Sequence, residues 1–112
     1  MPQAINYSFS TAENRNLAER ETTDLDELLP VARQLTTPKT ALYTHPRNLD
    51  GYLDFYVLDD GSIEMEIMER YVNDFAVIDA STAEHVIRIA MTDERDTTLR
   101  DKLHSLQLQW LT

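Results

Sequence analysis

Apolar and polar residues alternate on both sides of a turn near the middle of the chain. Residues 53–57 and 63–67 each place a large apolar side chain at every second position, which is the pattern of a half-buried β-strand. Asp59, Asp60 and Gly61 lie between the two segments and are typical of a hairpin turn. The pattern therefore predicts a β-hairpin.

The length of the loop decides which side chains face each other across this hairpin. A two-residue Asp60-Gly61 turn would place Val57 opposite Glu64 and would mix apolar and charged residues on both faces. A three-residue loop, with Gly61 in the left-handed conformation, pairs Val57 with Ile63 and keeps one face wholly apolar. Because a shift of one residue exchanges the two faces, we expect the three-residue loop. The same register pairs Phe55 with Met65 and Leu53 with Ile67.

The second face of the predicted hairpin carries tyrosines and carboxylates. Like charges directly opposite each other in a sheet are destabilising, which favours a functional explanation for this face. Tyrosine rings and carboxylates together suit a partner rich in arginine and lysine, through cation–π contacts and charge-assisted hydrogen bonds. A helix lying over this face would instead make the tyrosines part of the core. The expected partner-binding residues are Tyr52, Asp54 opposite Glu66, and Tyr56 opposite Glu64.

The rest of the chain predicts further strands and helices. Alternation indicates strands at residues 3–9, 41–45 and 75–78, and Asn73-Asp74 is expected to form a turn. Apolar residues at helical spacing predict a helix at about 24–36, which Pro30 should kink or delay. A second helix should follow a capping box at 81–84, and a third should follow the acids at 93–96. Residues 10–21 fit a surface loop or a short helix, and 106–110 fit a helix end or a strand.

These elements predict one α+β domain over residues 1–112. We expect an antiparallel sheet of about four or five strands packed against two or three helices. The chain has no cysteine, which excludes disulfides and thiolate metal sites. It also lacks an apolar run of about 20 residues and an N-terminal signal peptide, so we expect a cytoplasmic protein without membrane contact.

The charge of the chain is strongly negative. There are 20 acidic and 10 basic residues, which gives a net charge of −10. Such a field repels nucleic acid and anionic membranes and attracts cationic partners. Solubility alone, or adaptation to salt given the scarcity of lysine, are alternative explanations of the same composition.

No motif indicates catalysis or a cofactor. His45, His85 and His104 lie on separate predicted elements without the spacing of metal ligands. With two glycines there is no phosphate-binding loop, and no nucleophile has a base at a recognisable spacing. A flat sheet face also spreads its carboxylates apart, whereas a cation needs oxygens that converge. We therefore expect no enzyme activity, no cofactor and no bound metal.

A small, cysteine-free, strongly acidic α+β protein with this hairpin at residues 53–67 resembles the immunity proteins of bacterial toxin–immunity systems. The resemblance lies in size, charge and the hairpin, and no motif of one immunity family is matched. It implies an inhibitor that binds and neutralises a basic toxin domain, such as a nuclease. The alternative is a DNA mimic or anti-restriction protein that binds a DNA-binding protein. A small ligand-binding domain or enzyme is the third possibility.

Overall fold

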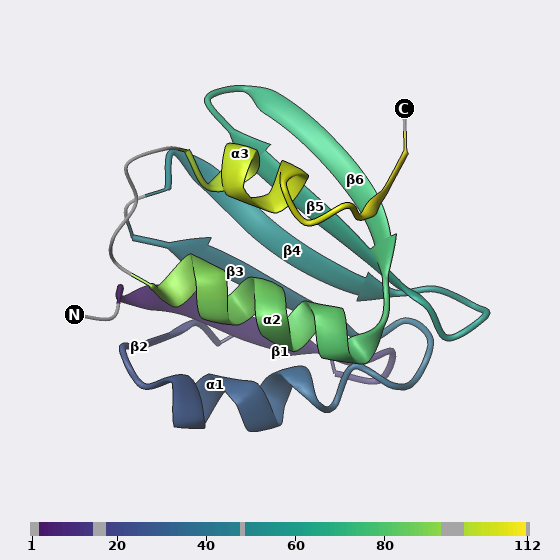
Figure 1. Ribbon diagram of the computed structural model, residues 1–112. Helices are drawn as coiled ribbons and strands as arrows, with labels where there is room; N and C mark the ends of the chain where they lie inside the picture. Colours follow the sequence, from purple (N-terminus) through teal and green to yellow (C-terminus); the bar gives the residue numbers. More distant parts are fainter. Residues whose placement is uncertain (1–2, 15–17, 48, 93–97, 112) are drawn as a thin grey trace.

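The computed structural model describes residues 3–14, 18–47, 49–92 and 98–111. Within them, one antiparallel sheet of seven strands has three helices packed against one of its sides (Figure 1). The α+β class is confirmed, but the prediction of four or five strands was too low. The strand order is β2-β1-β3-β4-β5-β6-β7. The strands are β1 (Ile5–Ser10), β2 (Arg20–Thr22), β3 (Ala41–Pro46), β4 (Gly51–Val57), β5 (Ile63–Glu69), β6 (Val72–Ile78) and β7 (Gln109–Leu111). The helices are α1 (Leu25–Ala32), α2 (Ala80–Met91) and α3 (Leu99–His104).

The two additional strands are the edges of the sheet. β2 and β7 have three residues each, too few for an alternating pattern to stand out in the sequence. β2 lies in the segment expected to be a loop or short helix, because its pairing with β1 is a long-range contact that local pattern does not reveal. Residues 106–110 fitted either a helix end or a strand, and the structure places Trp110 in the strand β7.

The hydrophobic core fills the space between the sheet and the helices. Alternate residues of the central strands are fully buried on this side, including Leu53, Phe55 and Val57 of β4. In Figure 1, α2 and α3 lie across this side of the sheet, and α1 lies alongside α2. The predicted apolar stripe of α2 is buried as expected: Ala83, Val86, Ile87 and Ala90.

The central hairpin has the predicted register and loop. Val57 pairs with Ile63. The Leu58 N–H donates to the Ser62 carbonyl oxygen at 2.8 Å, which closes a three-residue loop of residues 59–61. Gly61 has φ +88°, the left-handed conformation that the loop requires. The pairs Leu53 with Ile67, Phe55 with Met65 and Val57 with Ile63 keep the core residues on one face, while Met68 lies on the other, opposite Tyr52.

The next hairpin turns at a different place from the one predicted. Asn73 and Asp74 lie within β6, and the two-residue loop is formed by Arg70 and Tyr71. These two residues have φ values of 53° and 69°. Glycine or asparagine would normally take such positions, so the sequence contains no turn signal here and the nearby Asn-Asp pair was misleading.

The helix boundaries also differ in detail from the predictions. α1 begins after Asp24, whose carboxylate accepts the Asp26 N–H at 2.9 Å, but the helix ends at Ala32 instead of near residue 36. Pro30 lies inside it. α2 is capped by Asp79, which accepts the Thr82 N–H at 2.8 Å, so the predicted capping box at 81–84 begins inside the helix. The acids at 93–96 lie outside the described residues, and Thr98 caps α3.

The two glycines differ in how much space the structure leaves for a side chain. Gly51 has φ +152°, and a Cβ there would lie 1.8 Å from the backbone oxygen of Met68, whereas a Cβ at Gly61 would meet nothing within 4 Å. Gly51→Ala should therefore cost about 3 kcal/mol or more of unfolding free energy, because backbone must move. Gly61→Ala should cost only about 1 kcal/mol, the penalty of a left-handed alanine. Urea denaturation of both variants measures the difference, and equal losses would contradict this account of Gly51.

Candidate functional site: the open face of the sheet

The side of the sheet opposite the core is here called the open face. It consists of the strand residues whose side chains alternate with the core residues. No described helix lies over it, so the tyrosines and carboxylates of the hairpin are not core (Figure 1). Its members are Glu21 of β2, Asn6, Ser8 and Ser10 of β1, Ala41, Tyr43 and His45 of β3, Tyr52, Asp54 and Tyr56 of β4, Glu64, Glu66 and Met68 of β5, Asn73, Phe75 and Val77 of β6, and Gln109 and Leu111 of β7.

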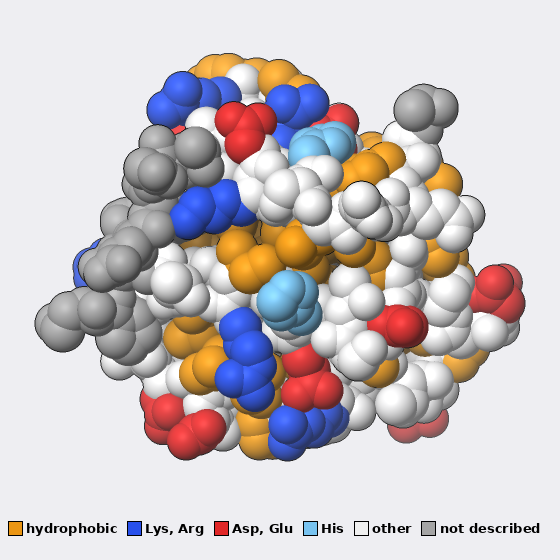
Figure 2. All heavy atoms as spheres, viewed as in Figure 1, with side chains coloured by type: hydrophobic (Ala, Val, Ile, Leu, Met, Phe, Trp, Pro, Cys, Tyr) orange, Lys and Arg blue, Asp and Glu red, His pale blue; other side chains and the backbone are white. Residues whose placement is uncertain are grey.

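Acidic and aromatic side chains define the chemistry of this face. The described strand positions of the open face include no lysine or arginine. Figure 2 shows the helix-covered side, where basic, acidic and histidine side chains are all present at the surface. All five predicted partner-binding residues lie on the open face. The pairings across the sheet also bring in Tyr43, directly opposite Asp54, and Phe75, directly opposite Glu66.

The Asp54 carboxylate supports the end of the β3–β4 ladder. Its Oδ1 accepts the Thr44 backbone N–H at 3.2 Å, while the Thr44 hydroxyl donates to the Leu53 carbonyl oxygen. The paired residues of β3 and β4 stop at Thr44 and Leu53, so the side chains replace ladder bonds there. Burial raises the pKa of Asp54 to about 6, and the neighbouring Glu66 adds to this rise against the opposing effect of the Thr44 hydrogen bond.

The Glu66 carboxylate is held by neutral donors. The Tyr52 hydroxyl donates to its Oε2 at 2.7 Å, and the Asn73 side-chain amide donates to the same oxygen at 2.6 Å. The hydrogen bond to Glu66, followed by burial, raises the pKa of the Tyr52 hydroxyl. The three side chains form a fixed polar group on β4, β5 and β6.

Glu64 is the carboxylate left available on the central strands. In the described part of the chain it has no hydrogen-bond or ion-pair partner. Tyr56 lies directly opposite it, with 43% of its surface exposed. Residues paired in this way have Cβ atoms about 5 Å apart, so a cation lying over the Tyr56 ring is within reach of the Glu64 carboxylate.

A second polar cluster, on the helix-covered side, could not be found from sequence spacing. Asp74 of β6 forms ion pairs with Arg100 and with His104, the latter at 2.9 Å. Burial opposes ionisation of Asp74, but hydrogen bonds from His104 and Arg100 together lower its pKa. The His104 ring stacks on Trp110 with centroids 4.0 Å apart. The cluster joins α3 and β7 to β6, which gives His104 a structural role.

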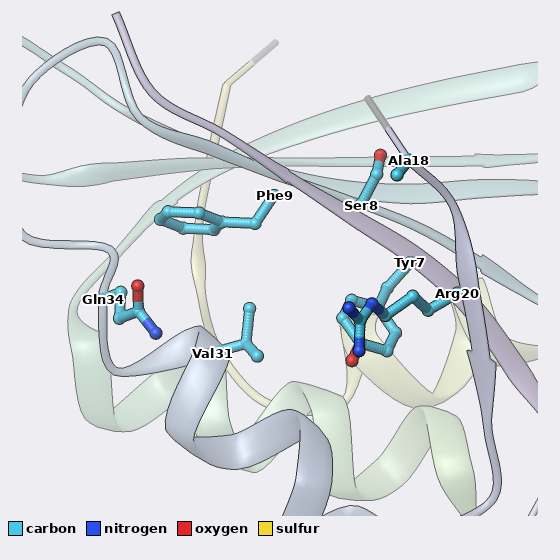
Figure 3. Close-up of a pocket in the computed structure, with 7 residues that line it drawn as sticks. All are labelled: Tyr7, Ser8, Phe9, Ala18, Arg20, Val31 and Gln34. Carbon is cyan, nitrogen blue, oxygen red and sulfur yellow. The ribbon is translucent and has the colours of Figure 1, made fainter. Parts of the chain in front are cut away.

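A pocket of about 310 Å³ lies between β1 and α1 (Figure 3). Tyr7 and Phe9 point from β1 toward α1, and Arg20 lies beside Tyr7. The Tyr7 hydroxyl donates to Glu27 at 2.7 Å, and burial followed by this hydrogen bond raises its pKa. The described lining contains Tyr7 and Arg20 but no carboxylate, histidine or cysteine.

Comparison of the chain with models of protein families, with curated proteins and with solved structures found no match. Among the described residues, no three histidine, aspartate or glutamate side chains converge in a way that could hold a metal ion. No described helix is long and apolar enough to cross a membrane. The function is therefore inferred from the geometry of the open face.

Asp54→Asn tests whether ionisation of the Asp54 carboxylate destabilises the folded protein. The pKa of Asp54 rises from 3.8 to about 6 on folding, so the folded protein loses stability as pH increases through this window. Asparagine keeps an acceptor for the Thr44 N–H but never ionises. The variant should be more stable than the parent by about 2–3 kcal/mol at pH 8, and the advantage should vanish near pH 4. Urea midpoints across this range measure the effect, and a difference that does not vary with pH would argue against it.

Proposed function

We propose that this protein binds a basic protein partner through its open face and acts as an immunity protein that neutralises a toxin domain. The observation that supports the proposal is the composition of the open face. Tyrosines and carboxylates lie across its central strands, and its described positions include neither lysine nor arginine. The net charge of −10 would attract a cationic partner over a longer distance.

The centre of the proposed contact is the pair of Tyr56 and Glu64. An arginine of the partner can stack on the Tyr56 ring while its guanidinium donates to Glu64, whose carboxylate has no partner among the described residues. Tyr43, with 38% of its surface exposed, offers a second ring on β3. Tyrosine is one of the residues that contribute most strongly to protein interfaces.

Glu66 and Asp54 would contribute less to binding than the pair of Tyr56 and Glu64. Glu66 keeps its charge fixed in place by Tyr52 and Asn73, so it adds to the negative potential without having to reorganise. A partner's cation beside Asp54 favours its ionised form, so binding and ionisation of Asp54 assist each other. On the central strands, the face thus combines Glu64, which has no partner among the described residues, with two carboxylates that are already positioned.

The geometry favours this function over mimicry of DNA. A mimic of the duplex requires acids in rows that follow two phosphate backbones. On the central strands, the row along β5 contains only Glu64 and Glu66. The tyrosines beside them have no counterpart in a phosphate backbone, and they suit recognition of a protein surface.

Glu64→Lys tests the proposed contact. If the proposed function is right, a gene for a secreted toxin lies beside the gene of this protein, and the inactivated C-terminal domain of that toxin is the probe. We expect the variant to bind about tenfold or more weakly, because a like charge replaces the partner's counter-ion, and to depend less on salt. Calorimetric titration at two salt concentrations measures both effects.

Asp101→Lys provides the matched control, because it makes the same change in net charge on α3, at an exposed residue on the helix-covered side. It should retain affinity within a few-fold. Equal losses in the two variants would show that net charge, and not the open face, determines binding. Absence of binding by the parent protein would refute the proposed function itself.

A further inference from the structure

We infer that the tip of the β5–β6 hairpin, formed by Arg70 and Tyr71, is a second contact for the same partner, with Tyr71 as an aromatic anchor. This inference rests on the proposed function. The hairpin tip is the end of the sheet that extends beyond α3 (Figure 1). Tyr71 has 91% of its surface exposed, the largest fraction among the exposed large apolar residues, and Val72 beside it has 44%.

The backbone of this tip is held in a conformation that its residues do not favour. Arg70 and Tyr71 both have positive φ, 53° and 69°, and they connect strands whose pairing extends to Glu69 with Val72. Two-residue hairpin loops of this kind strongly favour Asn-Gly or Asp-Gly, because side chains larger than glycine are strained there. The fold gains no burial from Tyr71 in exchange for this strain. Backbone strain that the fold does not need is a mark of a functional position.

The tip is also rigidly supported by a third strand. The Arg70 N–H donates to the Asp50 carbonyl oxygen at 2.9 Å. Gly51, at the start of β4, approaches the backbone of Met68 so closely that no side chain fits between them. The backbone that carries the ring is therefore already ordered, so binding does not have to order the loop.

The tip continues the open face along β5. Glu64, Glu66 and Met68 lie on that face in succession, and the loop follows directly. With a rise of about 3.3 Å per residue, the tip lies roughly 20 Å from Glu64. One partner of ordinary interface size can therefore cover both.

The chemistry of this second contact differs from that of the first. An exposed phenol ring fits an apolar pocket with a hydrogen-bond acceptor at its end, whereas Val72 lies on the helix-covered side of β6. Because the proposed partner is basic, the neighbouring Arg70 adds no attraction. The tip should contribute affinity that does not depend on salt, whereas the Glu64 contact should contribute affinity that does.

The experiment replaces the strained loop by a relaxed one and measures stability and binding together. The double variant Arg70→Asn, Tyr71→Gly should raise the melting temperature by about 5 °C, because the positive φ values then suit the residues. Its affinity for the same inactivated toxin domain should fall tenfold or more, and the salt dependence is read from Tyr71→Ala, which leaves the charge unchanged. Tyr71→Ala should lose the same affinity without the gain in stability, and Tyr71→Phe should bind within a few-fold of the parent.

The outcomes separate this inference from the proposed function. If Glu64→Lys weakens binding while the loop variants bind like the parent, the tip is not a contact and the inference is wrong, although the proposed function stands. If the parent does not bind the toxin domain, both are wrong. A loss of affinity in Tyr71→Ala with unchanged salt dependence supports the tip as an apolar anchor.

Discussion

One-sided burial of the sheet is the constraint on which the rest of the structure depends. Side chains of a strand alternate between two faces, so a single register assigns Phe55 and Met65 to the core and Asp54 and Glu66 to the opposite face. A shift of one residue would place carboxylates under the helices, where each unpaired charge is very costly. It would also remove several large side chains from the core, each contributing about 1.5–3 kcal/mol by burial. The core and the acidic face are therefore two consequences of one pairing.

The protein reduces the repulsion on its acidic face by internal means. Asp54 and Glu66 are directly opposite each other, an arrangement that destabilises a sheet when both are ionised. Asp54 accepts a backbone N–H and has a raised pKa, and Glu66 accepts two neutral side-chain donors. Glu64 receives no such support in the described structure. Asp54 and Glu66 therefore stabilise the sheet through their hydrogen bonds, whereas Glu64 only adds negative charge to the open face.

Local alternation was enough to predict the parts of the fold that carry the candidate site. The register of the central hairpin follows from the requirement that one face be apolar, and Gly61 marks its loop. The turn at Arg70 and Tyr71 could not be predicted in the same way, because neither residue favours positive φ. The cap at Asp79 was missed because Ser81 and Glu84 match the same local pattern two residues later.

Contacts between residues that are far apart in the sequence could not be predicted from local patterns. The contact of His104 with Asp74 joins residues 30 positions apart, and no spacing in the sequence indicates it. The edge strand β2 likewise depends on pairing with β1 across a loop. The exposure of the acidic face also depended on where the helices pack, since the sequence alone allowed either side.

The short edge strands have a consequence for the protein in concentrated solution. A sheet grows when further chains pair with the free backbone groups of its edge strands, which is the route to polymers and fibrils. Here each end of the sheet is a strand of three residues, and β2 presents Arg20 and Glu21 at its edge. A strand that pairs with an edge of three residues forms few backbone hydrogen bonds with it, so an incoming strand gains little. The molecule can therefore leave a wide face uncovered while its sheet resists lateral growth.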